Sequence, residues 1–251
     1  MNAIEIKGLT KTYRRGLGQP RIKAVDNLEL EVRAGEIFGF LGPNGAGKTS
    51  TIKMLMGFIF PTSGDASILG RPLGDVDVRR RVGYLQENPV FHGFLTGRQA
   101  LEFYAGLNGI PKKAAREKIP HLQKTLRLRE ELTLPLRKCS RGMAQKIGLA
   151  QSMINGPELF VLDEPMSGLD PIGQRDFRKA ILALKEEGRT VFFSSHIMAD
   201  VEMVCDRVGI LIGGRITRVI DVKEHREKEG TPLEEVFIGE IMKRHPEGAM
   251  L

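Results

Sequence analysis

A glycine-rich segment between an apolar run and a helical stretch constrains this chain more than any other feature. Ile37 to Leu41 is continuously apolar, as expected of a buried strand, and Thr49 to Met56 has helical character. Between them stands Gly-Pro-Asn-Gly-Ala-Gly-Lys-Thr, which fits the pattern G-x-x-x-x-G-K-[S/T]. A strand, a loop and a helix in this order form half of a β-α-β unit and predict a phosphate-binding loop.

The chemistry of this segment suits a nucleotide. Its glycines let successive backbone N–H groups turn inward, and the start of the helix adds positive potential. Lys48 would reach the β- and γ-phosphates, and the Thr49 hydroxyl would ligate Mg²⁺. The alternative is a chance glycine-rich turn, which the matching strand–loop–helix context disfavours. The ATP-binding residues predicted in this segment are Gly42, Pro43, Asn44, Gly45, Ala46, Gly47, Lys48, Thr49 and Ser50.

A second apolar run ends in two adjacent carboxylates. Leu159 to Leu162 is followed by Asp163, Glu164 and Pro165. A buried parallel strand delivers its carboxyl end to the ligand crevice, so Asp163 is placed to hold Mg²⁺, directly or through water. Glu164 then becomes the candidate base that polarises the attacking water. Standing alone, an Asp-Glu pair before proline is more often a turn cap, but here it follows a matching phosphate loop.

Further short motifs follow in a definite order. They are Gln86 after Val82-Gly83-Tyr84-Leu85, Ser140-Arg141-Gly142-Met143 opening a helix, Ser167-Gly168-Leu169-Asp170, and His196 after a strand. Read with the phosphate loop and the paired carboxylates, this order resembles the ATP-binding cassette (ABC) ATPases. The resemblance runs from about Ile4 to about Ile220. A series of motifs in the family's order is far more specific than any one of them.

The resemblance implies a role for each matched residue. Gln86 would touch Mg²⁺ or water, and His196 would donate to a γ-phosphate oxygen and so sense ATP against ADP. Tyr13 matches the family's aromatic residue that stacks on adenine, a contact typically worth ~1–3 kcal/mol. The ordinary alternatives are a loop glutamine, a structural histidine and a half-buried strand tyrosine. The predicted catalytic residues are Glu164, His196 and Gln86, and the predicted metal ligands are Thr49, Gln86 and Asp163.

The segment from Cys139 to Met143 departs from the family's common Leu-Ser-Gly-Gly-Gln form. It keeps the serine and the second glycine, so Ser140 and Gly142 are predicted to bind ATP, but it has Arg and Met in place of the first glycine and the Gln. This variant, like the segment from Gly35 to Leu41, resembles the branch that drives drug, polysaccharide and other exporters. Without the phosphate loop, the preferred interpretation would be a serine-capped helix that binds no ligand.

The expected fold is α/β, with a P-loop NTPase core built on a parallel sheet, an N-terminal antiparallel β subdomain and an inserted helical subdomain. Alternating residues from Leu28 to Val32 favour antiparallel strands, and Thr96 with Gln99 makes a possible capping box in the middle block. The expected ABC ATPase cassette covers residues 1–220, with the helical subdomain inserted at about residues 87–155. A short C-terminal helical tail is expected over residues 221–251.

Composition excludes several other classes. The chain has 251 residues, 41% hydrophobic and 27% charged, so it can bury a sizeable core and gives no reason to expect global disorder. Cys139 and Cys205 lie in neither a C-x-x-C nor a zinc spacing, which favours two reduced thiols over a disulfide. Apolar runs such as Met54 to Phe60 fall short of the ~18 residues of a membrane helix. The net charge of +7 favours an acidic partner without choosing among nucleotide, nucleic acid and anionic membrane.

The resemblance implies an ABC-type ATPase subunit that uses ATP and Mg²⁺ to power transport, of the export type, through a separate membrane permease. The implied partners are a second copy of the chain, in an ATP-sandwiched dimer, and the permease, which would hold the chain at the cytoplasmic face of the membrane. The alternative from another class is a soluble ABC ATPase acting on nucleic acid or in translation, to which the basic excess gives some weight. The block from Glu87 to Arg137 is too short for the long coiled coil of chromosome-maintenance members, so no nucleic acid is expected.

The segment from Glu87 to Thr96 combines Pro and Gly with apolar Val90, Phe91, Phe94 and Leu95. This composition suits the docking of a short permease helix in a groove. The alternative is that these side chains fill the inserted subdomain's own small core. The sequence leaves both interpretations open.

Overall fold

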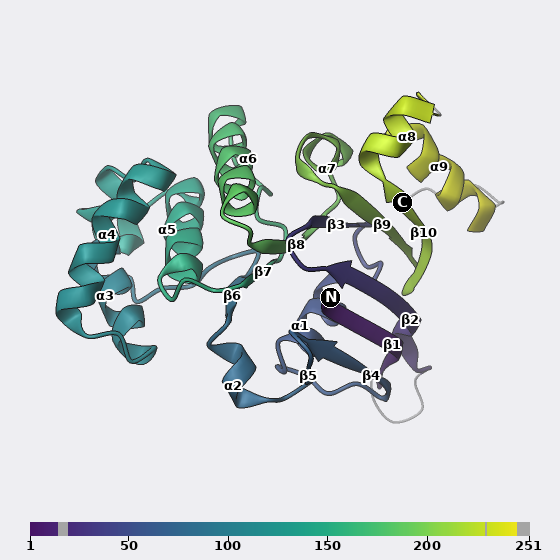
Figure 1. Ribbon diagram of the computed structural model, residues 1–251, viewed down its shortest axis with the longest axis horizontal. Coiled ribbons are helices and arrows are strands. Elements are labelled where there is room, and N and C mark those ends of the chain that lie inside the picture. The colour runs from purple at the N-terminus through teal and green to yellow at the C-terminus, as the bar shows by residue number, and fades with distance from the viewer. Residues whose placement is uncertain (15–19, 229, 245–251) are drawn as a thin grey trace. The chain divides into compact units, whose positions relative to one another are not determined.

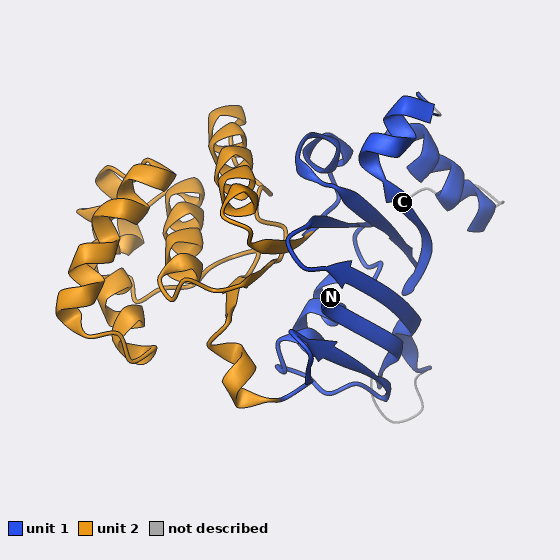
Figure 2. Cartoon of the chain, viewed as in Figure 1, with its two compact units in different colours: residues 1–74, 194–251 blue, residues 75–193 orange. Residues whose placement is uncertain are grey.

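The computed structural model describes residues 1–14, 20–228 and 230–244. The chain forms two compact units, residues 1–74 with 194–251 and residues 75–193 (Figure 2). The basic, glycine-rich loop expected from Arg14 to Arg21 falls largely outside the described residues.

The first unit contains an antiparallel sheet with the strand order β2-β1-β4-β5 (Figure 1). Buried Ile6 lies opposite Leu30 and buried Leu9 opposite Leu28, because alternate side chains of β1 and β2 face the core. The predicted antiparallel subdomain is confirmed, and β2 is longer than the alternating pattern from Leu28 to Val32 indicated. The strands are β1 (Asn2–Tyr13), β2 (Ile22–Arg33), β4 (Ser63–Ile68) and β5 (Arg71–Pro72).

The same unit holds β3 (Ile37–Leu41), which pairs in parallel with β9 (Arg207–Ile212). All five residues of β3 are buried, as its continuous apolar sequence predicts. β10 (Arg215–Asp221) pairs with β9 in the antiparallel sense. The helices of the unit are α1 (Lys48–Leu55), α7 (Met198–Val204), α8 (Val222–Lys228) and α9 (Leu233–Arg244). α8 and α9 both lie in the stretch of residues 221–251, for which the sequence predicts a short helical tail.

The second unit combines parallel strands with helices. β6 (Val82–Leu85) pairs in parallel with β7 (Leu159–Leu162), which pairs in parallel with the first part of β8 (Thr190–Ser195). Parallel neighbours require long crossover connections, and the alternation of strands and helices in the sequence supplies them. The α/β fold with parallel strands is therefore confirmed. The helices are α2 (Val76–Arg79), α3 (Gly97–Leu107), α4 (Lys112–Leu126), α5 (Arg141–Met153) and α6 (Pro171–Glu186), with short 3₁₀ turns at Glu130–Leu132 and Leu136–Lys138.

Side-chain caps define where three of these helices begin. Thr96 and Gln99 form the expected capping box at the start of α3. Ser140 Oγ accepts a hydrogen bond from Met143 N at 3.2 Å, and Asp170 Oδ1 accepts one from Gly173 N at 2.7 Å. These caps place the first residue of α5 at Arg141, as expected of a helix opened by Ser140, and the first residue of α6 at Pro171.

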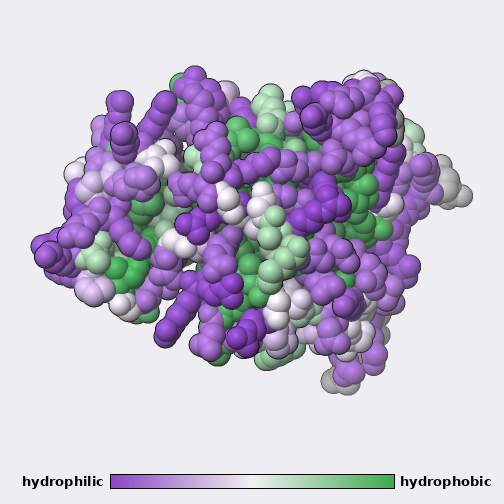
Figure 3. Space-filling model, viewed as in Figure 1, coloured by the Kyte–Doolittle hydropathy of each residue, from purple (hydrophilic) through white to green (hydrophobic). Residues whose placement is uncertain are grey.

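The surface and the thiols agree with the composition. In the described part of the chain, Cys139 and Cys205 are both thiols and form no disulfide. Among the described helices, none has the combination of length and apolar sequence that a bilayer crossing requires. Hydrophilic residues predominate on the face shown in Figure 3, with smaller hydrophobic areas between them.

Candidate functional site

The phosphate loop joins β3 to α1 in the first unit, and its shape depends on glycine. Gly47 stands at the N-cap of α1 with φ 110°, and a Cβ there would fall 2.3 Å from the carbonyl oxygen of Ala24. A Cβ on Gly42 would fall 2.5 Å from the carbonyl oxygen of Leu211. Neighbouring backbone therefore presses on both ends of the loop, and only glycine fits there.

Lys48 lies at the first position of α1, with 6% of the residue exposed. Its ammonium donates to the carbonyl oxygens of Gly42 and, at 3.2 Å, Pro43. Asn44 and Gly45 form the exposed tip of the loop. The Ala46 carbonyl accepts a hydrogen bond from Gly214 N at 2.9 Å. A helix N-terminus and a lysine cation thus share one loop, an arrangement that attracts anions.

Tyr13 and the strand before His196 reach the same loop. The Tyr13 hydroxyl lies 3.3 Å from Ser50 Oγ, and 37% of the tyrosine is exposed. Gly42 N donates to the Ser195 carbonyl at 3.2 Å, so exposed His196 follows directly on a residue that is bonded to the loop. The residues of the first unit that are predicted to stack on adenine, to bind the phosphates and to sense the γ-phosphate therefore lie in or next to the phosphate loop.

Gln86, Asp163 and Glu164 meet at the carboxyl ends of β6 and β7 in the second unit. Asp163 N donates to the Leu85 carbonyl at 2.8 Å, which sets the residues that follow the two strands side by side. Asp163 is 2% exposed and Glu164 is 8% exposed. The Gln86 amide donates to the Asn88 carbonyl at 2.9 Å, which folds its side chain along its own loop.

The electrostatics of this turn are visible at Tyr84, in β6. Burial, and secondarily the negative charge of Asp163, raise the pKa of Tyr84 to about 12. The oxygen donors predicted for Mg²⁺ are the Thr49 hydroxyl, the Gln86 amide and the Asp163 carboxylate, which suit a hard cation. The described residues contain no group of three or more His, Cys, Asp or Glu able to hold a metal. A hydroxyl, an amide oxygen and a single carboxylate are each kinds of ligand that Mg²⁺ takes beside water and substrate phosphates, and the Mg²⁺ site stays a prediction.

Ser140 and Gly142 lie at the start of α5. A hollow of about 430 Å³ is lined by Ser140 to Met143 on one side and by Gly168 to Asp170 on the other. The serine-containing segment and the Ser167-Gly168-Leu169-Asp170 motif therefore share one surface of the second unit. A serine hydroxyl, a glycine N–H and a helix N-terminus supply hydrogen-bond donors for an anion.

Comparison with known proteins identifies the family. The ABC transporter family model matches residues 25–167, which include the phosphate loop, Gln86, Ser140 and both carboxylates. The chain belongs to the ABC transporter family. An uncharacterised ABC transporter ATP-binding protein of Nostoc sp. is 47% identical over 83% of this chain, and the chain spans 63% of that protein's length. The bacitracin transport ATP-binding protein BcrA of Bacillus licheniformis is 40% identical over 92% of this chain and 74% of its own length.

The structural comparison agrees with that family. A solved structure of the ATP binding subunit of an ABC transporter has a TM-score of 0.81 and 29% identity, and covers 94% of this chain and 98% of its own. The predicted family and fold are thus confirmed for this ABC transporter family member. Tyr13 and His196 lie outside the matched residues 25–167, and the role of each site residue stays a prediction.

Two side chains of α5 that we did not predict contact the turn after β7. Gln145 is fully buried, and its Nε2 donates to the Pro165 carbonyl at 3.1 Å. Arg141 Nη2 donates to Ser167 Oγ at 3.4 Å and lies 3.8 Å from the Glu87 carboxylate. A polar residue within the buried face of a helix was the signal for Gln145. Nothing in the sequence indicates the partners of Arg141.

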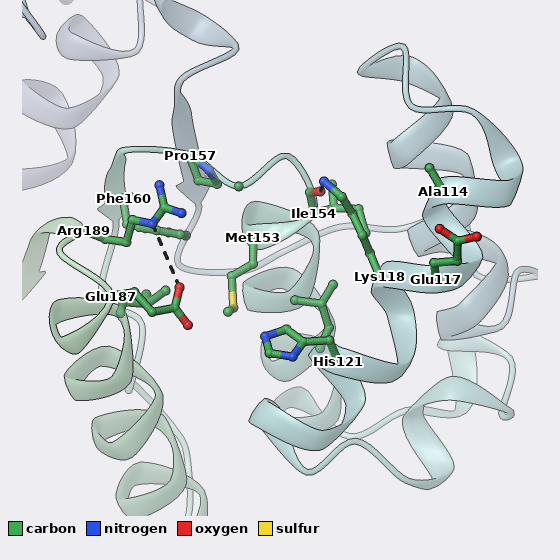
Figure 4. Close-up of a pocket in the computed structure, with 13 residues that line it drawn as sticks. Ala114, Glu117, Lys118, His121, Met153, Ile154, Pro157, Phe160, Glu187 and Arg189 are labelled. Carbon is green, nitrogen blue, oxygen red and sulfur yellow. Dashed lines mark hydrogen bonds and ion pairs between the residues drawn. The ribbon is translucent and has the colours of Figure 1, made fainter.

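A separate cavity of about 390 Å³ lies in the second unit, and none of the predicted site residues lines it. Its wall is formed by α4 and by residues at the ends of α5 and α6 (Figure 4). Lys118 Nζ donates to the Ile154 carbonyl at 3.1 Å, and Arg189 lies 4.0 Å from Glu187. The cations of this cavity thus already have polar partners in the protein. Its lining residues are Ala114, Glu117, Lys118, His121, Leu122, Met153, Ile154, Gly156, Pro157, Phe160, Leu184, Glu187 and Arg189.

Proposed function

We propose that this chain is the ATP-binding and ATP-hydrolysing subunit of an ABC transporter that powers transport, of the export type, through a separate membrane permease. The observation that carries the proposal is the phosphate loop, where Lys48 and a helix N-terminus meet in a turn that admits only glycine at Gly42 and Gly47. The likeness to a bacitracin transport protein supports a role in transport.

The phosphate loop binds the triphosphate in this proposal. Its backbone N–H groups and the Lys48 ammonium contact the β- and γ-phosphates. Thr49 and Asp163 would hold Mg²⁺, directly or through water, and Gln86 would touch the ion or its water. The ion, when bound, would supply positive charge that stabilises the triphosphate.

The remaining residues act on the base and on the attacking water. Glu164 accepts the proton of the water that attacks the γ-phosphorus. His196 donates a hydrogen bond to a γ-phosphate oxygen, and so its contact is lost once the γ-phosphate has left. The part-exposed ring of Tyr13 stacks on adenine.

A second copy of the chain completes each site in this proposal. Each chain has one phosphate loop to engage the γ-phosphate, whereas Ser140 and Gly142 form a further anion-binding end on the hollow described above. A two-fold, head-to-tail dimer places the α5 end of one copy against the ATP of the other. ATP then holds the copies together and hydrolysis releases them, which drives the permease between two states.

Mixing two inactive variants tests this arrangement. Lys48→Ala removes the phosphate contact, and Ser140→Arg blocks the donor end of α5 on the other copy. Each variant alone should show little ATP hydrolysis, and partial activity should return on mixing because one composite site per mixed dimer has both parts intact. Glu186→Gln, an exposed change on α6, serves as the control. Mixed dimers without recovered activity contradict a site shared in this way, and activity of Ser140→Arg alone removes Ser140 from the site.

The segment before α3 supplies a surface for the permease. Val90 is 79% exposed and Phe94 is 72% exposed, and the His92 ring lies 5.7 Å from that of Phe94 and 5.8 Å from that of Phe103. Phe91 instead packs edge-on against Tyr104, with 6.0 Å between ring centroids. The docking and core interpretations of this segment thus apply to different side chains, and we assign permease docking to Val90 and Phe94.

Paired serine substitutions separate these two roles. Phe94→Ser should weaken co-purification with the permease while leaving the melting temperature of the isolated chain nearly unchanged, because its ring is exposed. Phe91→Ser should lower the melting temperature through lost packing, at a cost of about 1–3 kcal/mol for a half-buried ring. The reverse outcome, with assembly sensitive only to Phe91, contradicts the assignment.

Attachment to the permease would hold the chain at the cytoplasmic face of the membrane. The alternative, a soluble ABC ATPase acting on nucleic acid or in translation, finds some support in the basic charge of α4. Lys112 and Arg116 of that helix lie 3.9 and 3.3 Å from the Glu102 carboxylate, so part of this charge is already paired. Purification from detergent-solubilised cells distinguishes the two, since co-purifying nucleic acid would support the alternative and a co-purifying membrane protein the permease.

A further inference from the structure

The turn after β7 has an unusual backbone at the residue proposed as the base. Glu164 has φ 47°, in the left-handed region that residues other than glycine rarely adopt. Such a conformation persists only where the surroundings hold it in place. Two backbone hydrogen bonds hold the turn around Glu164. Asp163 N donates to the Leu85 carbonyl at 2.8 Å, and Ser167 N donates to the Glu164 carbonyl at 3.1 Å.

Gln145 makes the next contact along this turn from inside the unit. Its Nε2 donates to the Pro165 carbonyl, the one hydrogen-bonding group that the backbone of a proline offers. Within the described structure, the buried Oε1 atom of Gln145 has no hydrogen-bond partner. An apolar side chain of the same size would avoid that penalty. A glutamine at this position is therefore explained by the bond that its Nε2 makes to the residue after Glu164.

Arg141 contacts the outer half of the same turn. A Cβ on Gly168 would fall 2.8 Å from the Arg141 guanidinium, so the guanidinium lies directly on that glycine, beside its 3.4 Å bond to Ser167 Oγ. Arg141 and Gln145 stand four residues apart in α5, which places them on one face of the helix. This face of α5 therefore contacts the turn after β7 twice, through Gln145 at Pro165 and through Arg141 at Ser167 and Gly168.

We propose that Gln145 is a positioning residue that holds Glu164 in its catalytic geometry through the Pro165 carbonyl, and that Arg141 secures the outer part of the turn. The same segment then carries Ser140, which is proposed to contact ATP, at the N-cap of α5, and it fixes the base of its own chain through Gln145, five residues further on. This inference rests on the proposed role of Glu164.

A double-substitution cycle with purified chain tests the inference. Gln145→Met keeps the length of the side chain and removes the donor, so kcat for ATP hydrolysis should fall about 10- to 100-fold, the cost of a misplaced catalytic group, with KM changed less than about threefold. In the Glu164→Gln background the same change should alter the residual single-turnover rate less than about twofold, because no base remains to be positioned. Gln151→Met, the same change at a half-buried site on α5, is the matched control and should leave both rates unchanged.

Each outcome decides the matter. Equal losses in the two backgrounds, or an unchanged kcat in Gln145→Met, overturn the proposal. If Gln145→Met does not fold, Arg141→Ala replaces it in the same cycle, because that side chain is 45% exposed and tolerates truncation. Arg141→Ala should lower kcat about 3- to 10-fold with Glu164 present and less than about twofold without it. An unchanged rate in Glu164→Gln itself refutes the proposed base rather than its positioning.

Discussion

The phosphate loop and the start of α5 are both helix N-termini assigned to phosphate, yet they are built in different ways. α1, which follows the phosphate loop, has Gly47 at its N-cap and no side-chain cap, and a Cβ on Gly47 would lie 2.3 Å from a backbone oxygen. α5 begins with a serine cap, and a Cβ on Gly142 would meet only Leu169 Cδ2, at 3.4 Å. Surrounding backbone dictates the first end, whereas side chains shape the second.

This difference predicts that the phosphate loop tolerates fewer substitutions than the start of α5. A loop enclosed by backbone admits few sequences, and this chain retains its full pattern there. The start of α5 has room for Arg141, whose guanidinium lies over Gly168 instead of clashing with its surroundings. The departure from the family's common form at this segment is thus compatible with a preserved serine cap at 3.2 Å.

The largest effect should separate nucleotide binding from chemistry. Glu164→Gln leaves the phosphate loop intact and removes the base, so turnover should fall about 10²- to 10⁴-fold while ATP still binds. Phosphate release and titration with a fluorescent ATP analogue measure the two properties. An ATP-bound dimer should accumulate on size exclusion. Turnover within a few-fold of the unsubstituted chain would assign the activation of water to another residue.

Matched alanine substitutions at the two glycines test the comparison directly. Gly47→Ala should lower the free energy of unfolding by about 2–4 kcal/mol, because it combines a positive φ with a backbone clash. Gly142→Ala should change it by less than about 0.5 kcal/mol, since its new Cβ makes an ordinary contact. Chemical denaturation of both variants without nucleotide gives the values. Similar losses at the two sites would contradict the distinction between them.

The sequence predicted what depends on local pattern. The phosphate loop, the paired carboxylates and the Thr96 capping box each depend on residues that are close together in the sequence. Each lies where the sequence pattern indicated. The contacts of Gln145 with Pro165 and of Arg141 with Glu87 join segments that are distant in the chain, so no short motif encodes them. The left-handed backbone of Glu164 likewise follows from tertiary packing, since nothing about a glutamate predicts φ 47°.

The smallest effect concerns the charge beside the base and is measured without nucleotide. Burial is the larger cause of the raised pKa of Tyr84, about 12, and the negative charge of Asp163 is the smaller one. Asp163→Asn removes the charge that opposes phenolate formation, so the pKa of Tyr84 should fall yet stay above its ordinary value of 10.0. Tyr13→Phe and Tyr104→Phe, present in both proteins, leave Tyr84 as the remaining tyrosine, and ultraviolet absorbance follows its titration.

The raised pKa of Tyr84 should also make the free energy of unfolding depend on pH. The folded chain holds the phenol proton more tightly than the unfolded chain, so this contribution is complete below the ordinary pKa of 10.0 and is lost as the pH rises toward about 12. Asp163→Asn should lower the pKa of Tyr84 in the folded chain. The variant should therefore lose this contribution to stability at a lower pH than the unsubstituted chain. A titration midpoint that is unchanged or higher in Asp163→Asn would show that the charge of Asp163 does not act on the Tyr84 phenol, and that burial alone raises its pKa.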